Sequence, residues 1–541
     1  MRFSKGSRCS RPTSAGDDRG VALVVVILAM AVLSLFLLSS LAYALNGTLP
    51  ARRDQDAKTA IGAAEAGIDE YISRLSANDN YWKNAGVDST NAAFSAVGQV
   101  IQGTGTSGAR YKYQVLTSPA SIAANGVILL KVTGMSSPGN GGATISRTLT
   151  ANLKPKGFLS YVYLSDVEVI DPNLVGDPAS CGNYYYATST APARSSSGCS
   201  EIQWASGDTV NGPLHSNDAL QIGSSVNFTN FKTETSWPAT QTMSTSAKTW
   251  WGSQNPPLTG FSPHYAAHVD LPTSNNTLLS EVEPDVDGDS STPVGSGCYY
   301  TGATRIIMQG TTMKVLSPGT TRSDIPARCY NRSTPTVEQT VVIPPVIYVD
   351  STSSSCTLGA VGYPAAQEKY TVGSSTAVSW GTTTNYDCTR GSAYVQGASN
   401  TQVTIAAKDD VVVTGDITLT GSTSGTNVVG LIAGNYVWIY HPLKTGTNNN
   451  LYTTPNVNNV SAAILALRHS FVVQNWAYGA LLGTLNVTGS IAQKYRGAVA
   501  TSGTTGYLKN YVYDTRLANL QPPYFLQADN SPWELSTMTD G

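Results

Sequence analysis

Six cysteines are the residues whose type and spacing most clearly predict chemistry. The chain has seven in all, and six of them lie far from the N-terminus: Cys181, Cys199, Cys298, Cys329, Cys356 and Cys388. No pair has the CxxC or CxxxxC spacing typical of structural zinc sites. An even number of cysteines in an oxidising compartment favours disulfides. The spacing suggests that successive cysteines pair in chain order, although other connectivities remain open.

A histidine pair with a nearby carboxylate is the first candidate cation site. His264 and His268 stand four residues apart and Asp270 follows them, so a helix would bring both rings to one face. However, Pro263 precedes the pair, and the glutamate of an HExxH zinc site is absent. We therefore expect these histidines to lie in an exposed loop.

An acidic run is the second candidate cation site. Asp285, Asp287 and Asp289 alternate along the chain after Glu281 and Glu283, so an extended segment would place these carboxylates on one face. Calcium accepts such oxygen ligands, but the glycine and the glutamate of an EF-hand loop are not at their positions. A solvated acidic turn is the simpler interpretation, and we expect no bound metal and no cofactor.

Catalytic motifs are weak in this chain. The sequence has no GxSxG nucleophile elbow and no GxxxxGK[ST] phosphate loop. Asp409, Asp410 and Asp416 could form the carboxylate cluster of a polysaccharide lyase or hydrolase. However, Asp409 and Asp410 are adjacent and would point to opposite faces of a strand. We expect a charged turn here and no enzymatic activity.

Three aromatic residues could contact a partner. Tyr436, Trp438 and Tyr440 alternate along one strand face, where they could stack on a surface glycan or on another protein. Packing in the core or under a cap is the alternative that we favour. A surface glycan is therefore only an alternative partner.

The composition limits the classes of protein to consider. The chain has 541 residues, of which 13% are charged, and its formal net charge is -2. This charged fraction is about half of the usual value near 25%, which argues against a helical cytosolic enzyme and against a disordered chain. Basic blocks are absent, so nucleic acid is not an expected partner. A surface rich in Gly, Ser, Thr and Asn indicates β structure in an exported protein.

The N-terminal segment carries the strongest structural signal. Residues 1–20 have an excess of positive charge, and residues 21–45 are apolar and uncharged. A helix over 21–45 rises about 37 Å and would cross a bilayer core of about 30 Å, with its basic flank in the cytoplasm. Apolar residues then recur at helical spacing as far as Leu75, and Glu70 can pair with Arg74. Pro50 should kink or break the helix between these two halves.

Three features of this segment fit a known pattern. They are Arg19-Gly20, the run Val21-Ala-Leu-Val-Val-Val that follows, and Ala63-Ala-Glu-Ala-Gly67 further along the chain. Together they resemble the leader and N-terminal helix of type IV pilins, specifically minor pilins with a PilX-type N-terminus. The resemblance implies a type III leader that a prepilin peptidase removes between Gly20 and Val21. It also implies that Cys9 leaves with the leader and that other pilin subunits are the partners.

One position departs from the pilin pattern. In major pilins the fifth mature residue is usually Glu, and here it is Val25. A carboxylate in an apolar setting needs a cation beside it, and in pilins it is thought to meet the terminal amine of a neighbouring subunit. The resemblance therefore implies a minor component, for example at a tip, rather than the repeating subunit. An ordinary single-pass anchor is the alternative interpretation.

The chain beyond the helix is expected to be mainly β. Residues 109–116, 126–134 and 143–153 form β-rich runs between Gly, Ser and Pro turns, so a small antiparallel sheet should pack on the amphipathic helix. Between 402 and 499, short β runs recur at intervals of roughly 20 to 30 residues, which is typical of a parallel β-solenoid. These intervals separate Val403 from Val429, Val437 from Ile464, and Ile464 from Leu485. A sandwich or several small sheets is the alternative.

The predicted fold class is thus α+β, mainly β: a long N-terminal pilin-like helix, a small antiparallel sheet and a parallel β-solenoid. The expected parts are a leader (1–20), a transmembrane and amphipathic helix (21–75), a pilin-like sheet (86–155), a disulfide-bearing region of solenoid coils and loops (156–400), a β-solenoid (401–500) and an aromatic C-terminal cap (501–541). We expect a structural or assembly component of a type IV pilus, held in the cytoplasmic membrane through residues 21–45 and later displayed at the cell surface. A membrane-anchored adhesin or polysaccharide-active enzyme is the alternative.

Overall fold

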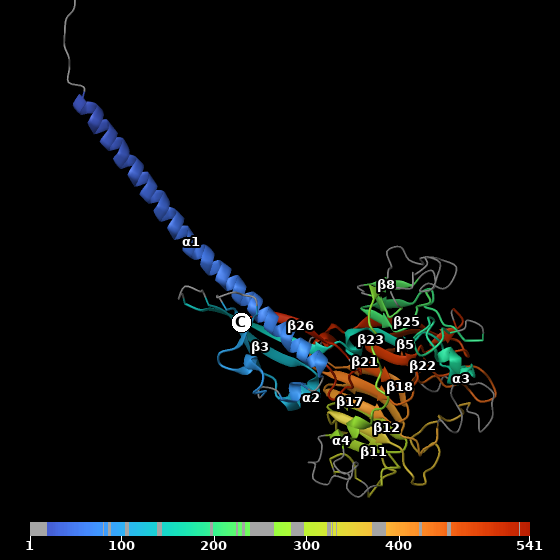
Figure 1. Ribbon diagram of the computed structural model, residues 1–541. Helices are drawn as coiled ribbons and strands as arrows, with labels where there is room; N and C mark the ends of the chain where they lie inside the picture. The colour runs from blue at the N-terminus through green and yellow to red at the C-terminus, as the bar shows by residue number, and fades with distance from the viewer. Residues whose placement is uncertain are drawn as a thin grey trace, which may run out of the picture.

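The computed structural model describes residues 19–541, except 79–80, 85–87, 103–107, 138–142, 195–197, 223–225, 230–232, 238–263, 283–296, 322–325, 327, 332, 370–385, 421–424, 452–455, 502 and 530. The described residues form one long N-terminal helix, an antiparallel sheet beside its second half and a larger body of parallel strands (Figure 1). The chain is mainly β, as its composition and strand patterns predict.

Helix α1 (Arg19–Ala77) is one continuous element of 59 residues. The predicted break at Pro50 is wrong, because the helix runs through this residue (Figure 1). A proline inside a helix removes one main-chain hydrogen bond and crowds the preceding turn, at a cost of ~3 kcal/mol. Regular turns continue on both sides of Pro50, and the second half of the helix is stabilised further by packing on a sheet.

The antiparallel sheet has five strands in the order β1, β2, β3, β4, β26. Their bounds are β1 (Gln99–Val100), β2 (Arg110–Val115), β3 (Ile128–Ser136), β4 (Ile145–Pro155) and β26 (Trp533–Asp540). Strands β2, β3 and β4 coincide with the three runs that the sequence predicts. Strand β26 comes from the C-terminal segment and pairs with β4.

The second half of α1 lies across one face of this sheet. Its buried side chains recur at helical spacing: Ala60, Ala64, Ile68, Tyr71 and Leu75. Most of them pack with Leu130 and Val132 of β3 and their neighbours in a core distinct from that of the parallel body. The amphipathic face therefore fixes the helix to the sheet.

The parallel body contains a long ladder of stacked strands. In spatial order the strands are β10 (His264–Tyr265), β9 (Thr233–Thr235), β7 (Leu214–Ser216), β5 (Tyr163–Val167), β23 (Leu481–Tyr495), β21 (Asn459–Ala466), β19 (Val428–Ala433), β17 (Gln402–Ala407), β15 (Val346–Asp350) and β11 (Cys298–Thr301). Every pair in this ladder is parallel. Side chains on both faces are buried, as all six residues of β19 show.

Further ladders run beside the first one. One contains β8 (Asn227–Thr229), β6 (Thr209–Asn211), β25 (Thr505–Tyr513) and β23. Another contains β22 (Phe471–Val473), β20 (Val437–Ile439), β18 (Val411–Leu419), β16 (Ala393–Ser399) and β12 (Thr304–Gly310). Antiparallel additions are β13 (Thr312–Leu316) and β14 (Gln339–Val342) next to β12, and β24 (Ala500–Thr501) next to β25.

The stacking order differs from the chain order. The chain enters the body at β5, passes through β7 and β9 to β10, and then continues from β11 at the opposite end of the ladder back to β23. As a result, β5 pairs with β23 and β6 pairs with β25, although these strands are far apart in sequence. Short helices lie in the connections: α2 (Pro119–Asn125), α3 (Pro172–Val175) and α4 (Leu279–Val282).

Two details of the predicted organisation are corrected by this topology. Residues 501–541 do not form a cap, because they supply β25 to the parallel body and β26 to the antiparallel sheet. The predicted interval from Val403 to Val429 is a true register pair. The other two intervals are wrong, since Val437 pairs with Phe471 and Ile464 pairs with Ile491.

Candidate functional site: the exposed apolar helix

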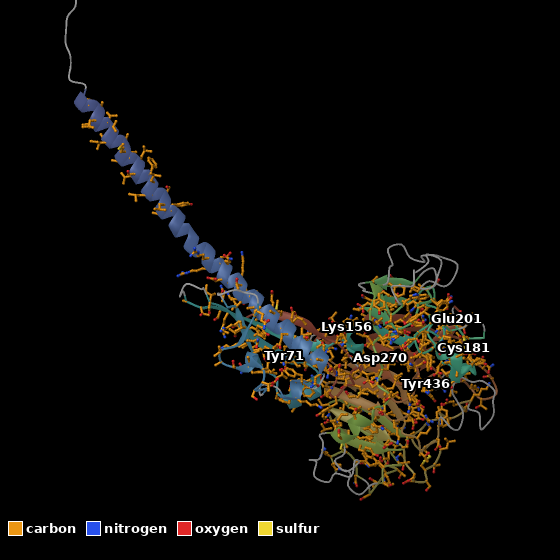
Figure 2. The ribbon with its side chains drawn as sticks, viewed as in Figure 1. Tyr71, Lys156, Cys181, Glu201, Asp270 and Tyr436 are labelled. Atoms are coloured by element: carbon orange, nitrogen blue, oxygen red, sulfur yellow. A yellow bond between two sulfur atoms is a disulfide. The ribbon has the colours of Figure 1, made fainter. Side chains whose placement is uncertain are left out.

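The first half of α1 presents an apolar surface that no described residue covers. Residues Val21–Tyr43 form a stretch of 23 residues of which 0% is buried, and within the described part of the chain this is the one helix long and apolar enough to cross a membrane. Phe36 is 70% exposed and Leu37 is 68% exposed. Figure 2 shows these side chains standing clear of the rest of the molecule.

The length of this stretch matches a bilayer. Twenty-three helical residues rise about 34 Å, and the hydrocarbon core of a membrane is about 30 Å thick. The first charged residues after Val21 are Arg52 and Arg53, both exposed. An apolar helix of this kind is stable in lipid or among other apolar helices, but not in water.

A partly buried carboxylate links α1 to the sheet. Glu70 of α1 forms an ion pair with Arg74 and accepts a hydrogen bond of 3.0 Å from the Tyr113 hydroxyl of β2. Burial raises the pKa of Tyr113, so its hydroxyl keeps the proton that it donates. The predicted Glu70 and Arg74 pair therefore also ties the helix to the sheet.

Small residues allow α1 and the sheet to approach closely. A Cβ at Gly67 would lie 2.8 Å from side-chain atoms of Tyr111 and Val132, and a Cβ at Gly134 of β3 would lie 1.9 Å from the Ala60 carbonyl oxygen. The motif Ala63-Ala-Glu-Ala-Gly67 thus lies where the helix crosses the strands. In this structure the motif has a packing role.

The predicted cleavage position lies at the start of the same helix. Gly20 and Val21 are in the first turn of α1, and Val21 is 65% exposed. Residues 1–18, which make up nearly all of the predicted leader, lie outside the described residues.

The six distal cysteines form three disulfides in chain order. The bridges are Cys181–Cys199, Cys298–Cys329 and Cys356–Cys388, with Cα atoms 5.5, 5.5 and 5.9 Å apart. Each bridge closes a segment between two strands of the long ladder: β5 and β7, β11 and β15, and β15 and β17. The disulfides therefore restrain the longest connections of the parallel body.

Of the two candidate cation sites, the histidine pair does not lie on a helix, and the acidic run lies outside the described residues. His264 lies in strand β10 rather than on a helix, while the Nε2 of His268 lies 2.9 Å from the Tyr186 hydroxyl. Asp285, Asp287 and Asp289 lie outside the described residues. One group of close side chains combines Asp387 with Cys356 and Cys388, but these two cysteines are bonded to each other and cannot bind a metal as thiolates.

The three candidate catalytic carboxylates have structural partners. Asp410 is buried, pairs with Arg390 at 3.1 Å and accepts a hydrogen bond from the Tyr436 amide. Asp409 accepts one from the Gly391 amide. Asp416 accepts hydrogen bonds from the amides of the Asn458–Asn459 turn. All three carboxylates hold connections between strands in place.

The three aromatic residues in and beside β20 pack against other parts of the molecule. Trp438 is 1% exposed and Tyr440 is 2% exposed, so neither ring can stack on a glycan. The Tyr436 hydroxyl donates to Asp171, and the ring stacks on His469. Tyr440 and Tyr386 both donate to Glu368, a buried carboxylate that no sequence motif marks.

Buried ion pairs in the parallel body are a further feature that the sequence does not reveal. Arg496 pairs with Glu168 at 2.7 Å and Lys509 pairs with Asp208 at 2.7 Å, and all four side chains are at most 8% exposed. Both pairs join strands from the beginning and the end of the body. A sequence signal is lacking because the partners are separated by about three hundred residues.

Comparisons with known proteins do not place the chain in a family. No protein-family model and no curated protein matches it. Among solved structures, the competence-associated pilin ComZ from Thermus thermophilus matches with 12% identity and a TM-score of 0.27, over 90% of this chain and 97% of that chain. A likeness at this TM-score carries no argument about fold or role, so the functional conclusion depends on the helix and the sheet themselves.

Proposed function

We propose that the protein is a structural or assembly subunit of a type IV pilus or a related cell-surface filament. The observation that carries this proposal is the uncovered apolar half of α1, continuous with a half that packs on an antiparallel sheet. The same combination of an apolar helix and a helix-covered sheet is what the resemblance to minor pilins implies. The partners are then other pilin subunits.

Apolar burial supplies the driving force for assembly. Lipid covers the stretch Val21–Tyr43 while the subunit waits in the cytoplasmic membrane. In water, exposing a stretch of this size costs on the order of tens of kcal/mol, so the helix can leave lipid only by packing against neighbouring helices. The antiparallel sheet holds the second half of α1 and leaves the first half available for such packing.

The subunit is proposed to be a minor one. Val25 is 58% exposed on the helix and has no carboxylate that could pair with the terminal amine of another subunit. A position at an end of the filament, where that pairing is not needed, suits such a subunit better than the repeating positions do.

The parallel body is proposed to be a β-solenoid displayed outside the cell. Its stacked parallel ladders and its three disulfides support this arrangement, since disulfides persist in oxidising compartments. The partners found for Asp409, Asp410 and Asp416 support a structural rather than an enzymatic role.

Mass spectrometry of the mature N-terminus tests the proposal. A subunit that a prepilin peptidase has processed begins at Val21, and filaments sheared from the cell surface should contain it. An intact residue 1–20 segment, or a cut far from Gly20, in protein that remains in the membrane would instead indicate an adhesin on a permanent anchor.

A further inference from the structure

Lys509 and Asp208 lie together in the interior of the parallel body. Strand β25 pairs with β6 in a register that places Asn510 beside Thr209, so the residues before them also lie side by side. The Lys509 Nζ is 2.7 Å from an Asp208 carboxylate oxygen, and the two side chains are 8% and 1% exposed. Water therefore has little access to this contact.

The surroundings orient both reacting groups. The Asp208 carboxylate accepts hydrogen bonds from the backbone amides of Lys509 at 3.1 Å and Ala205 at 2.8 Å, which withdraw electron density from its carbon. The ring of Trp204 lies 5.6 Å from the Lys509 Nζ. Burial lowers the pKa of Lys509, which favours the neutral amine.

A second acid lies near the pair. Glu168 is buried, accepts a hydrogen bond of 2.7 Å from Arg496 and acts electrostatically on Lys509. The guanidinium of Arg496 stacks on the Trp204 ring, the same ring that lies near Lys509, at 4.3 Å from the ring centre.

We propose that Lys509 and Asp208 become joined by an intramolecular amide bond between Nζ and the side-chain carbon of Asp208. A proton moves directly from the Lys509 ammonium to the Asp208 carboxylate oxygen that lies 2.7 Å away. The amine lone pair then attacks the carboxyl carbon, the new C–N bond forms, and one C–O bond breaks. The nitrogen passes a second proton to the departing oxygen, which leaves as water, so the ion pair supplies every atom of the products and no oxidant is needed.

A cavity beside the pair gives the water a way out. Its volume is about 280 Å³, and Asp208 and Lys509 are among the residues that line it. The neighbouring ion pairs lack the same chemistry: Arg496 offers a guanidinium, which is a poor nucleophile, and Lys494, which pairs with Asp166, is 35% exposed. The amide bond would covalently link β25, near the end of the body in the sequence, to the start of β6, near its beginning.

Peptide mass spectrometry of the full-length chain, purified in detergent, reduced and alkylated, tests this inference. The expected result is a branched tryptic peptide that contains both Lys509 and Asp208 and is lighter than the two separate peptides by one water. Trypsin should also fail to cleave after Lys509. Recovery of the two unlinked peptides from folded protein, with no branched species, would overturn the proposal.

Two matched variants separate the amide bond from the ion pair. Lys509→Arg keeps the charge but removes the nucleophile, so its intact mass should lack the water loss that the wild-type chain shows. Lys494→Arg is the control and should retain that loss. A water loss that persists in Lys509→Arg would contradict the assignment.

Discussion

Gly134 shows how much a single position decides in this protein. It lies in β3 where α1 crosses the sheet, and an added Cβ would lie 1.9 Å from the Ala60 carbonyl oxygen. Backbone atoms cannot move aside as a flexible side chain can, so the helix itself would have to shift. At Gly62, on the exposed side of the same helix, an added Cβ would meet nothing within 4 Å.

The first prediction compares these two glycines. Gly134→Ala should destabilise the antiparallel sheet by about 1–3 kcal/mol because it overpacks the helix contact. Gly62→Ala, the matched control, should stabilise it by roughly 1 kcal/mol through higher helix propensity. Thermal unfolding of the full chain in detergent measures both effects. Equal melting temperatures for the two variants would show that α1 does not approach β3 this closely.

Glu368 carries the second prediction. It is 3% exposed, and burial raises its pKa above the ordinary value of 4.5 in spite of the hydrogen bonds that it accepts. The folded state therefore holds the proton to higher pH than the unfolded state does. This contribution to stability is complete below pH 4.5 and is lost as the pH rises through the raised pKa.

The variant Glu368→Gln cannot titrate, so its stability should fall less than that of the wild type as the pH rises from about 4.5. Melting temperatures measured in parallel from acidic to neutral pH give the two slopes. Identical slopes would mean that Glu368 ionises normally in the folded protein.

At the scale of elements, α1 combines two environments in one helix. Its second half is held by Ile68, Tyr71 and Leu75 against the sheet, whereas the stretch Val21–Tyr43 has no partner among the residues that the structure describes. Because α1 is continuous through Pro50, a single helix joins the sheet to the apolar stretch.

The third prediction concerns the apolar stretch. Leu33→Asp should block incorporation into filaments and weaken membrane insertion, because a carboxylate at the centre of an apolar helix costs about 2.5–3.5 kcal/mol. Thr59→Asp adds the same charge at an exposed position of the second half and should leave incorporation normal. Immunoblots of sheared surface filaments measure both. Normal incorporation of Leu33→Asp would count against the proposed assembly.

At the scale of the whole molecule, two connections join the antiparallel sheet to the parallel body. The chain leaves the sheet after β4 to begin β5, and it returns after β25 to add β26 at the sheet edge. Figure 1 accordingly shows the C-terminus beside α1 rather than at the far end of the body. The Lys154–Glu534 pair, with 3.8 Å between its charged atoms, joins β4 to β26 within the sheet.

The fourth prediction removes one connection. A chain that ends at Pro532 lacks β26 and the buried Trp533, so β4 becomes an edge strand. Amides of β3 and β4 should then exchange hydrogen faster, while those of β17 and β19 should keep their protection. A chain that ends at Asp540 is the control and should match the wild type. Unchanged protection of β4 in the shorter chain would show that β26 adds no stability.

Local sequence patterns determined much of this protein. The uncharged run after Gly20, the helical spacing up to Leu75 and the three strand patterns before residue 156 predict elements that the structure contains, because each depends on periodicity along a single segment. The order of the cysteine pairs also follows the chain. Pro50 was the exception, since a proline penalty is local and the stabilising turns and sheet contacts outweigh it.

Only the tertiary structure decided which distant segments meet. The pairing of β5 with β23 and of β26 with β4 depends on backbone hydrogen bonds, which are alike for every residue type and leave no mark in the sequence. The contact of Lys509 with Asp208 follows from the pairing of β25 with β6. The roles of buried polar residues therefore emerge from packing, whereas the exposed apolar helix is determined by its own composition.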